Sequence, residues 1–130
     1  MENLKIDESK FIPGICLNAE TGVLEISGNS GASAVEEYER SSGYWAIMLN
    51  WLEQYLQNPR PKTTFICKLK YFDTATPQYL LKVFKALGTL NEPYIAEIFW
   101  YVEKGDENML EFIDDLNRIL GSIQIQIVAE

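Results

Sequence analysis

The apolar and polar positions of the chain follow two periods, which predicts that strands and helices alternate. Strands are predicted where β-branched and aromatic residues run together or alternate with polar ones, over residues 12–18, 23–28, 63–72, 94–102 and 122–128. Helices are predicted where apolar residues recur at spacings of three and four, over residues 44–57, 77–87 and 107–120, with an earlier helical piece over 34–40. The last strand alternates strictly, which is typical of an edge strand with one wet face.

This order predicts an α/β fold with a single sheet of about five strands, arranged β-β-α-β-α-β-α-β. A turn over residues 19–22 joins the first two strands as an antiparallel hairpin. The three β-α-β units imply parallel pairing of the last four strands through right-handed crossovers. The chain has 130 residues and no linker-like stretch, so we expect one domain over residues 1–130, with residues 1–10 as a flexible N-terminus.

The charge balance excludes two classes of partner. The formal net charge is −8 at neutral pH, which opposes nonspecific binding to nucleic acid or to an anionic membrane surface. No apolar run is long enough to span a bilayer, and the polar, acidic N-terminus does not resemble a signal peptide. We therefore expect a soluble, cytoplasmic protein with no nucleic-acid or membrane partner.

The residue types that most enzymes of this size require are missing. The chain contains no histidine and only two cysteines, which rules out Ser-His-Asp and Cys-His nucleophilic sites and a four-cysteine zinc site. Cys16 and Cys67 lie in apolar strands and are expected to be reduced and buried. The adjacent carboxylates at 36–37, 106–107 and 114–115 are expected at helix starts or on solvated helix faces. We predict no catalytic residue, no metal and no cofactor.

One loop carries a functional signal, because ligands and switches of open α/β sheets lie beyond the carboxyl ends of the strands. The third predicted strand ends at Phe72, and Asp73, Thr74, Ala75 and Thr76 lead into the next helix. A phosphate on a hydroxyl there would meet free backbone N–H groups at the positive end of the helix dipole. Spacing alone favours a plainer interpretation, in which Thr76 is only the N-cap of a helix that begins at Pro77.

Four sequence motifs favour the functional interpretation of this loop. They are, in chain order, LEISGNS (24–30), NWLEQYL (50–56), LKYFDTATPQYLLKVFKAL (69–87) and IFWYVEKGDENMLEFIDDL (98–116). Together they resemble the SiaC family of bacterial regulatory phosphoproteins over residues 12–128. The predicted strand order is also similar to that of STAS-domain anti-sigma-factor antagonists, which carry a phosphorylatable hydroxyl at a strand-to-helix junction.

The resemblance implies a non-enzymatic signalling protein. The family's phosphorylated threonine corresponds to Thr74, with Thr76 as second choice. A Ser/Thr protein kinase would add the phosphate and a metal-dependent PP2C-like phosphatase would remove it. The unphosphorylated form would bind and activate a diguanylate cyclase, and so raise cyclic di-GMP, or would bind another effector. The partner surface would be formed by the switch loop and its neighbours, namely Asp73, Ala75, Thr76, Gln78, Tyr71 and Tyr101.

The chain departs from the family pattern at the loop itself. Asp73 stands where the family has Asn, Ala75 and Thr76 replace two serines, and Gln78 replaces a lysine, while extra residues lie between Ser30 and Trp51. Because Asp73 would repel a phosphate on Thr74, a constitutive scaffold that has lost the switch is one alternative. A small enzyme that uses Asp73 and nearby carboxylates, with Mg²⁺, is the other.

Overall fold

The computed structural model describes residues 1–31 and 43–130. In these ranges it has one mixed sheet and three helices, as the α/β prediction requires. The elements are β1 (Leu4–Ile6), β2 (Gly14–Asn18), β3 (Val23–Ser30), α2 (Tyr44–Gln57), β4 (Lys62–Phe72), α3 (Thr76–Leu87), β5 (Ile95–Val102), α4 (Glu107–Leu120) and β6 (Ile125–Ala129). The helical piece predicted over residues 34–40, and much of the extra segment between Ser30 and Trp51, lie outside the described residues.

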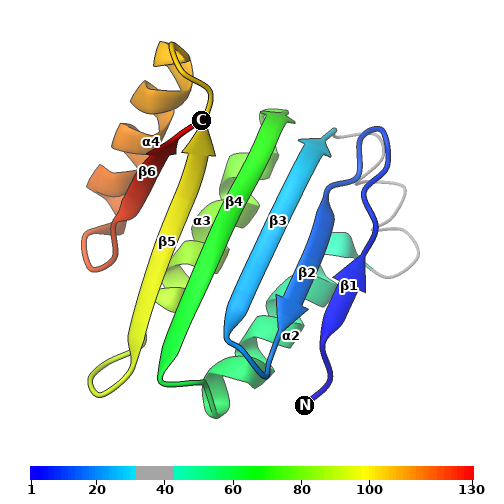
Figure 1. The fold of residues 1–130 in the computed structure, drawn as a ribbon, viewed down its shortest axis with the longest axis vertical. Coiled ribbons are helices and arrows are strands. Elements are labelled where there is room, and N and C mark those ends of the chain that lie inside the picture. Colours follow the sequence, from blue (N-terminus) through cyan, green and yellow to red (C-terminus); the bar gives the residue numbers. More distant parts are fainter. Residues whose placement is uncertain (32–42) are drawn as a thin grey trace.

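The six strands lie in sequence order, β1 to β6, across the sheet (Figure 1). β2 and β3 form the predicted antiparallel hairpin, and β3 to β6 are parallel as predicted. The additional strand is β1, inside the segment that we expected to be flexible. Leu4 and Ile6 pair with Leu17 and Ile15 and pack against the core. A strand of three residues is too short to show a period, so the sequence pattern could not reveal it.

The helices cover one face of the sheet, and in the part of the chain that the structure describes no helix covers the other, which we call the uncovered face. Figure 1 views the uncovered face, with α2 and α3 behind the strands. Trp100 of β5 is fully buried and its ring contacts Phe84 of α3 and Phe112 of α4, so these two helices share the same face. Strand residues alternate between this apolar layer and the uncovered face, which carries ion pairs such as Lys62–Glu97 at 3.5 Å.

The ends of α4 follow the predicted signals. Asp106 accepts a hydrogen bond from the Met109 amide at 3.1 Å, which is the N-cap interaction expected of it. Gly121 follows the last helical residue with a φ of 67°, a conformation that side chains disfavour and glycine tolerates. Local chemistry therefore sets the limits of this helix.

The two cysteines are in different environments, which corrects the expectation that both are buried. Cys67 faces the helix layer and is buried, whereas Cys16 is exposed. Cys16 lies between Ile15 and Leu17, which are both buried, so the pleat of β2 turns its side chain to the uncovered face. Burial raises the pKa of the Cys67 thiol to about 12, so this thiol remains protonated under ordinary conditions.

We predict that a thiol reagent at about pH 8 labels one cysteine of the folded chain and two after denaturation. Cys16 reacts because it is exposed, whereas Cys67 is protected by burial and by its raised pKa. Mass spectrometry of the labelled protein, with Cys16→Ser as the control variant, measures the sites. Rapid labelling of Cys67 in the folded Cys16→Ser variant would contradict this assignment.

Candidate functional site

The predicted loop lies where β3 and β4 end side by side. The two strands are parallel, and Ser30 at the end of β3 is in register with Phe72 at the end of β4. The next amide, that of Asp73, donates to the carbonyl oxygen of Ser30 at 3.1 Å. The loop therefore begins as a continuation of the β3–β4 pairing, and α3 starts three residues later at Thr76.

Three side chains connect β3, the loop and α3. The Thr76 hydroxyl donates to Asp73 Oδ1 at 2.9 Å and lies 2.7 Å from the Ser30 hydroxyl oxygen. Ser30 and Thr76 are 0% and 2% exposed, which makes them two of the few buried polar residues among those described. We call Ser30, Asp73 and Thr76 the clasp. Buried hydroxyls are costly unless paired, so the two hydroxyls stabilise each other.

The N-cap residue of α3 is Ala75, and the side chain that bonds to the amides at this helix start is that of Asp73, not that of Thr76. Asp73 Oδ1 accepts from the amides of Ala75 and Thr76 at 3.1 and 3.0 Å, the pattern of an N-cap side chain that reaches two and three residues ahead. The prediction of Thr76 as N-cap is therefore wrong. Its hydroxyl faces Ser30 instead, because Thr76 already belongs to the helix and lies against the end of β3.

The expectation of free amides at the start of α3 is corrected for the two amides nearest Thr74. The amides of Ala75 and Thr76 are both occupied by Asp73, and the next residue, Pro77, has no N–H to donate. The positive end of this helix already holds a carboxylate.

Four uncharged residues of this segment are accessible, whereas their neighbours Lys70, which is exposed, and Asp73, which is partly exposed, carry charge. Thr74, Ala75 and Gln78 are exposed, and Tyr71 at the end of β4 is 54% exposed. We call these four residues the switch surface. Its side chains carry no charge, and within the described residues the Thr74 hydroxyl has no hydrogen-bond partner. Thr74 is thus an accessible hydroxyl, whereas Thr76, the second predicted site, is buried.

Tyr101, the remaining predicted residue of the partner surface, is on β5 and not on β4 or in the loop. It lies between Trp100 and Val102, which are both buried under the helices, so its ring is on the uncovered face of the sheet. The Lys68 ammonium lies 4.9 Å from the Tyr101 ring centre and 3.1 Å from the Glu25 carboxylate. A hydrogen bond from Lys68 to Glu25 and the charge of that carboxylate raise the pKa of Lys68.

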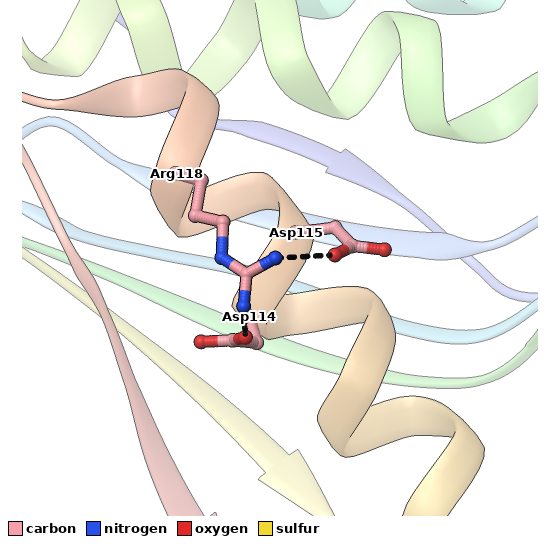
Figure 2. A network of polar contacts seen from close by, with 3 residues as sticks. All are labelled: Asp114, Asp115 and Arg118. Atoms are coloured by element: carbon pink, nitrogen blue, oxygen red, sulfur yellow. Dashed lines mark hydrogen bonds and ion pairs between the residues drawn. The ribbon is translucent and has the colours of Figure 1, made fainter.

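The acidic residues of α4 lie on its solvent-exposed face, as predicted. Asp114 and Asp115 pair with Arg118 at 2.8 and 3.7 Å, and all three side chains are mostly exposed (Figure 2). In residues 1–31 and 43–130, no three His, Cys, Asp or Glu side chains are grouped so that they could hold a metal ion. The same part of the chain contains no helix long and apolar enough to cross a membrane.

Ser30 is the site residue that our sequence analysis missed. The pattern contained a signal for it, because Ser30 continues the alternation of Leu24 and Ile26, which face the helices. A polar residue in that series calls for a buried partner. The identity of the partner depends on the β3–β4 pairing, which places Ser30 46 positions away in sequence from Thr76.

The sequence and the fold as a whole are similar to those of known proteins. A sequence model described as SiaC family regulatory phosphoprotein matches residues 6–130. No match was found among curated proteins.

The fold is similar to solved structures from Pseudomonas aeruginosa. Apo-SiaC matches with a TM-score of 0.80 and 18% identity, covering 98% of each chain. A second structure of SiaC matches with a TM-score of 0.81 and 17% identity over 100% of each chain. A chain in the complex of the diguanylate cyclase SiaD with its activator SiaC matches with a TM-score of 0.83 and 17% identity, covering 98% of this chain and 99% of that one.

We predict that Thr76→Val lowers the free energy of unfolding by about 1–3 kcal/mol, because it leaves the buried Ser30 hydroxyl without this partner. The Ser30→Ala/Thr76→Val double variant should lose less than the sum of the single variants. Urea unfolding measures both effects. Thr74→Val is the matched control and should change stability by less than about 0.5 kcal/mol. An equal loss in Thr74→Val would show that the clasp has no special role.

Proposed function

The chain belongs to the SiaC family of regulatory phosphoproteins, and on this basis we propose that it is a non-enzymatic signalling protein switched by phosphorylation of Thr74. A Ser/Thr protein kinase transfers the γ-phosphoryl group of ATP to the Thr74 hydroxyl oxygen. The products are a phosphate monoester, ADP and the hydroxyl proton. A metal-dependent PP2C-like phosphatase hydrolyses the ester with water, which restores the hydroxyl and releases inorganic phosphate.

The observation that carries the proposal is the contrast between the two threonines of the loop. Thr74 is exposed, whereas Thr76 is 2% exposed and bonded to Asp73 and Ser30. A kinase must bring the acceptor oxygen to within bonding distance of the γ-phosphate. Only Thr74 of these two offers its hydroxyl without unfolding of the start of α3.

The partner that we propose is a diguanylate cyclase, bound by the unphosphorylated form. This rests on family membership and on the complex of SiaD with its activator SiaC, whose matching chain shares this fold. The switch surface suits such an interface, because interface centres are depleted of charge and enriched in tyrosine, here Tyr71. A phosphate adds about −1.5 to −2 charge units, and burying that charge without a cationic partner is costly.

We predict that incubation with the cognate kinase and ATP adds about 80 Da to the wild-type chain and to Thr74→Ser. Thr74→Ala should gain no mass, because the acceptor oxygen is gone. Intact-mass spectrometry measures the incorporation. Phosphorylation of Thr74→Ala at the wild-type level would refute the site, and a wild-type chain that binds its partner yet never gains phosphate would identify a constitutive scaffold.

We also predict that Thr74→Glu weakens binding to the cognate diguanylate cyclase at least about tenfold, equivalent to about 1.4 kcal/mol, while Thr74→Ala binds like wild type. Isothermal titration calorimetry measures both affinities. Thr89→Glu is the matched control, because Thr89 is also exposed but lies just beyond the other end of α3. Equal weakening by both glutamates would mean that net charge, and not the switch surface, governs binding.

A further inference from the structure

The place that a phosphate on Thr74 would take is already occupied. A phosphate next to a helix N-terminus accepts hydrogen bonds from the first free backbone amides. Here the amides of Ala75 and Thr76 donate to Asp73 Oδ1 at 3.1 and 3.0 Å. Pro77 offers no amide, so a phosphate on Thr74 bonds to the two amides nearest to it only if Asp73 gives them up.

Asp73 is held in this position by one oxygen. Its Oδ1 accepts from two amides and from the Thr76 hydroxyl. Its Oδ2 is buried and has no hydrogen-bond partner among the described residues. A buried carboxylate oxygen without a donor is unfavourable. The hydrogen bonds that stabilise the Asp73 carboxylate are therefore those to Oδ1, and a neighbouring phosphate would compete for the two that come from amides.

We infer that Asp73 is a built-in occupant of the anion site at the start of α3, and that a phosphate on Thr74 displaces it and opens the clasp. This inference rests on the proposed function, and it adds a mechanism to it. The phosphate carries more charge than one carboxylate and has three acceptor oxygens, and the two anions are on adjacent residues, so they repel each other.

Displacement of Asp73 also affects the contact between α3 and β3. The Thr76 hydroxyl loses its bond to Asp73, and that hydroxyl is also the partner of Ser30 in β3. Phosphorylation therefore changes the shape of the loop between β4 and α3 as well as its charge. A partner that fits the unphosphorylated switch surface would therefore meet a charged surface in place of an uncharged one, and a loop of different shape.

The test is a thermodynamic cycle between Asp73 and the phosphate. Full-length chains are prepared with threonine or with phosphothreonine at position 74, introduced during translation, and with Asp73, Asp73→Ala or Asp73→Asn. Thermal unfolding gives the melting temperature of each. Asp73→Asn keeps the shape of the side chain and an acceptor oxygen for the two amides but removes the charge, so it separates capping from repulsion.

In the unmodified protein, Asp73→Ala should lower the melting temperature by about 4 °C, the shift expected for loss of one helix cap in a chain of this size. In the phosphorylated protein the same change should cost less than about 1 °C, because the phosphate has already replaced Asp73 on the amides. Phosphorylation should also destabilise the wild-type chain more than Asp73→Asn, in which the opposing charge is absent.

The inference is overturned if Asp73→Ala lowers the melting temperature equally in the unmodified and the phosphorylated chain. It is also overturned if phosphorylation lowers the melting temperatures of the wild type and of Asp73→Asn equally. Phosphothreonine at Thr21, exposed in the turn before β3, is the control and should leave the cost of Asp73→Ala unchanged. Equal costs count against the inference even if phosphate at Thr74 abolishes cyclase binding. If Asp73→Ala no longer lowers the melting temperature of the phosphorylated chain, the inference is supported, even if that chain still binds the cyclase. Persistent cyclase binding by the phosphorylated chain would overturn the proposed function instead.

Discussion

The handedness of the β-α-β crossover is the constraint on which the arrangement of this molecule depends. The four parallel strands follow one another in sequence order, so each crossover steps in the same direction across the sheet. A right-handed crossover that always steps the same way places every helix on the same face. The result is a sheet with α2, α3 and α4 on one face and, among the described residues, no helix on the other (Figure 1).

This one-sided arrangement gives the two faces different tasks. The covered face holds the large aromatic core, in which Trp100 and Phe84 are fully buried and in edge-on contact. The uncovered face holds the pairs that involve Lys68 and Tyr101. Parallel strands also end at a common edge, and there Ser30 of β3 meets Asp73 and Thr76 after β4. The clasp therefore lies where the apolar layer ends and the loop begins.

The chemistry of the loop follows from a division of labour between adjacent residues. Asp73 accepts hydrogen bonds from the amides at the start of α3, and the Thr76 hydroxyl pairs with the buried Ser30 hydroxyl, so the polar groups of both residues stabilise the fold. Thr74, between them, has its hydroxyl in solvent. A loop with one accessible hydroxyl is suited to modification, since its structural bonds do not involve the acceptor oxygen. The same bonds occupy the amides of Ala75 and Thr76, so in the mechanism that we propose the carboxylate of Asp73 competes with a phosphate on Thr74 for these two donors.

Sequence alone determined the local features of this protein: the alternation of strands and helices, the hairpin, the cap at Asp106, the position of the loop between β4 and α3 and the resemblance to a family of regulatory phosphoproteins. These depend on residues near one another in the chain, where periodicity and capping chemistry act directly. The tertiary structure decided which polar groups meet. The pairing of β1, the exposure of Cys16, the partnership of Ser30 with Thr76 and the placement of Tyr101 on the uncovered face all depend on strand register and on which face each side chain occupies. A local pattern cannot contain this information, because a shift of one residue in register exchanges the two faces of a strand.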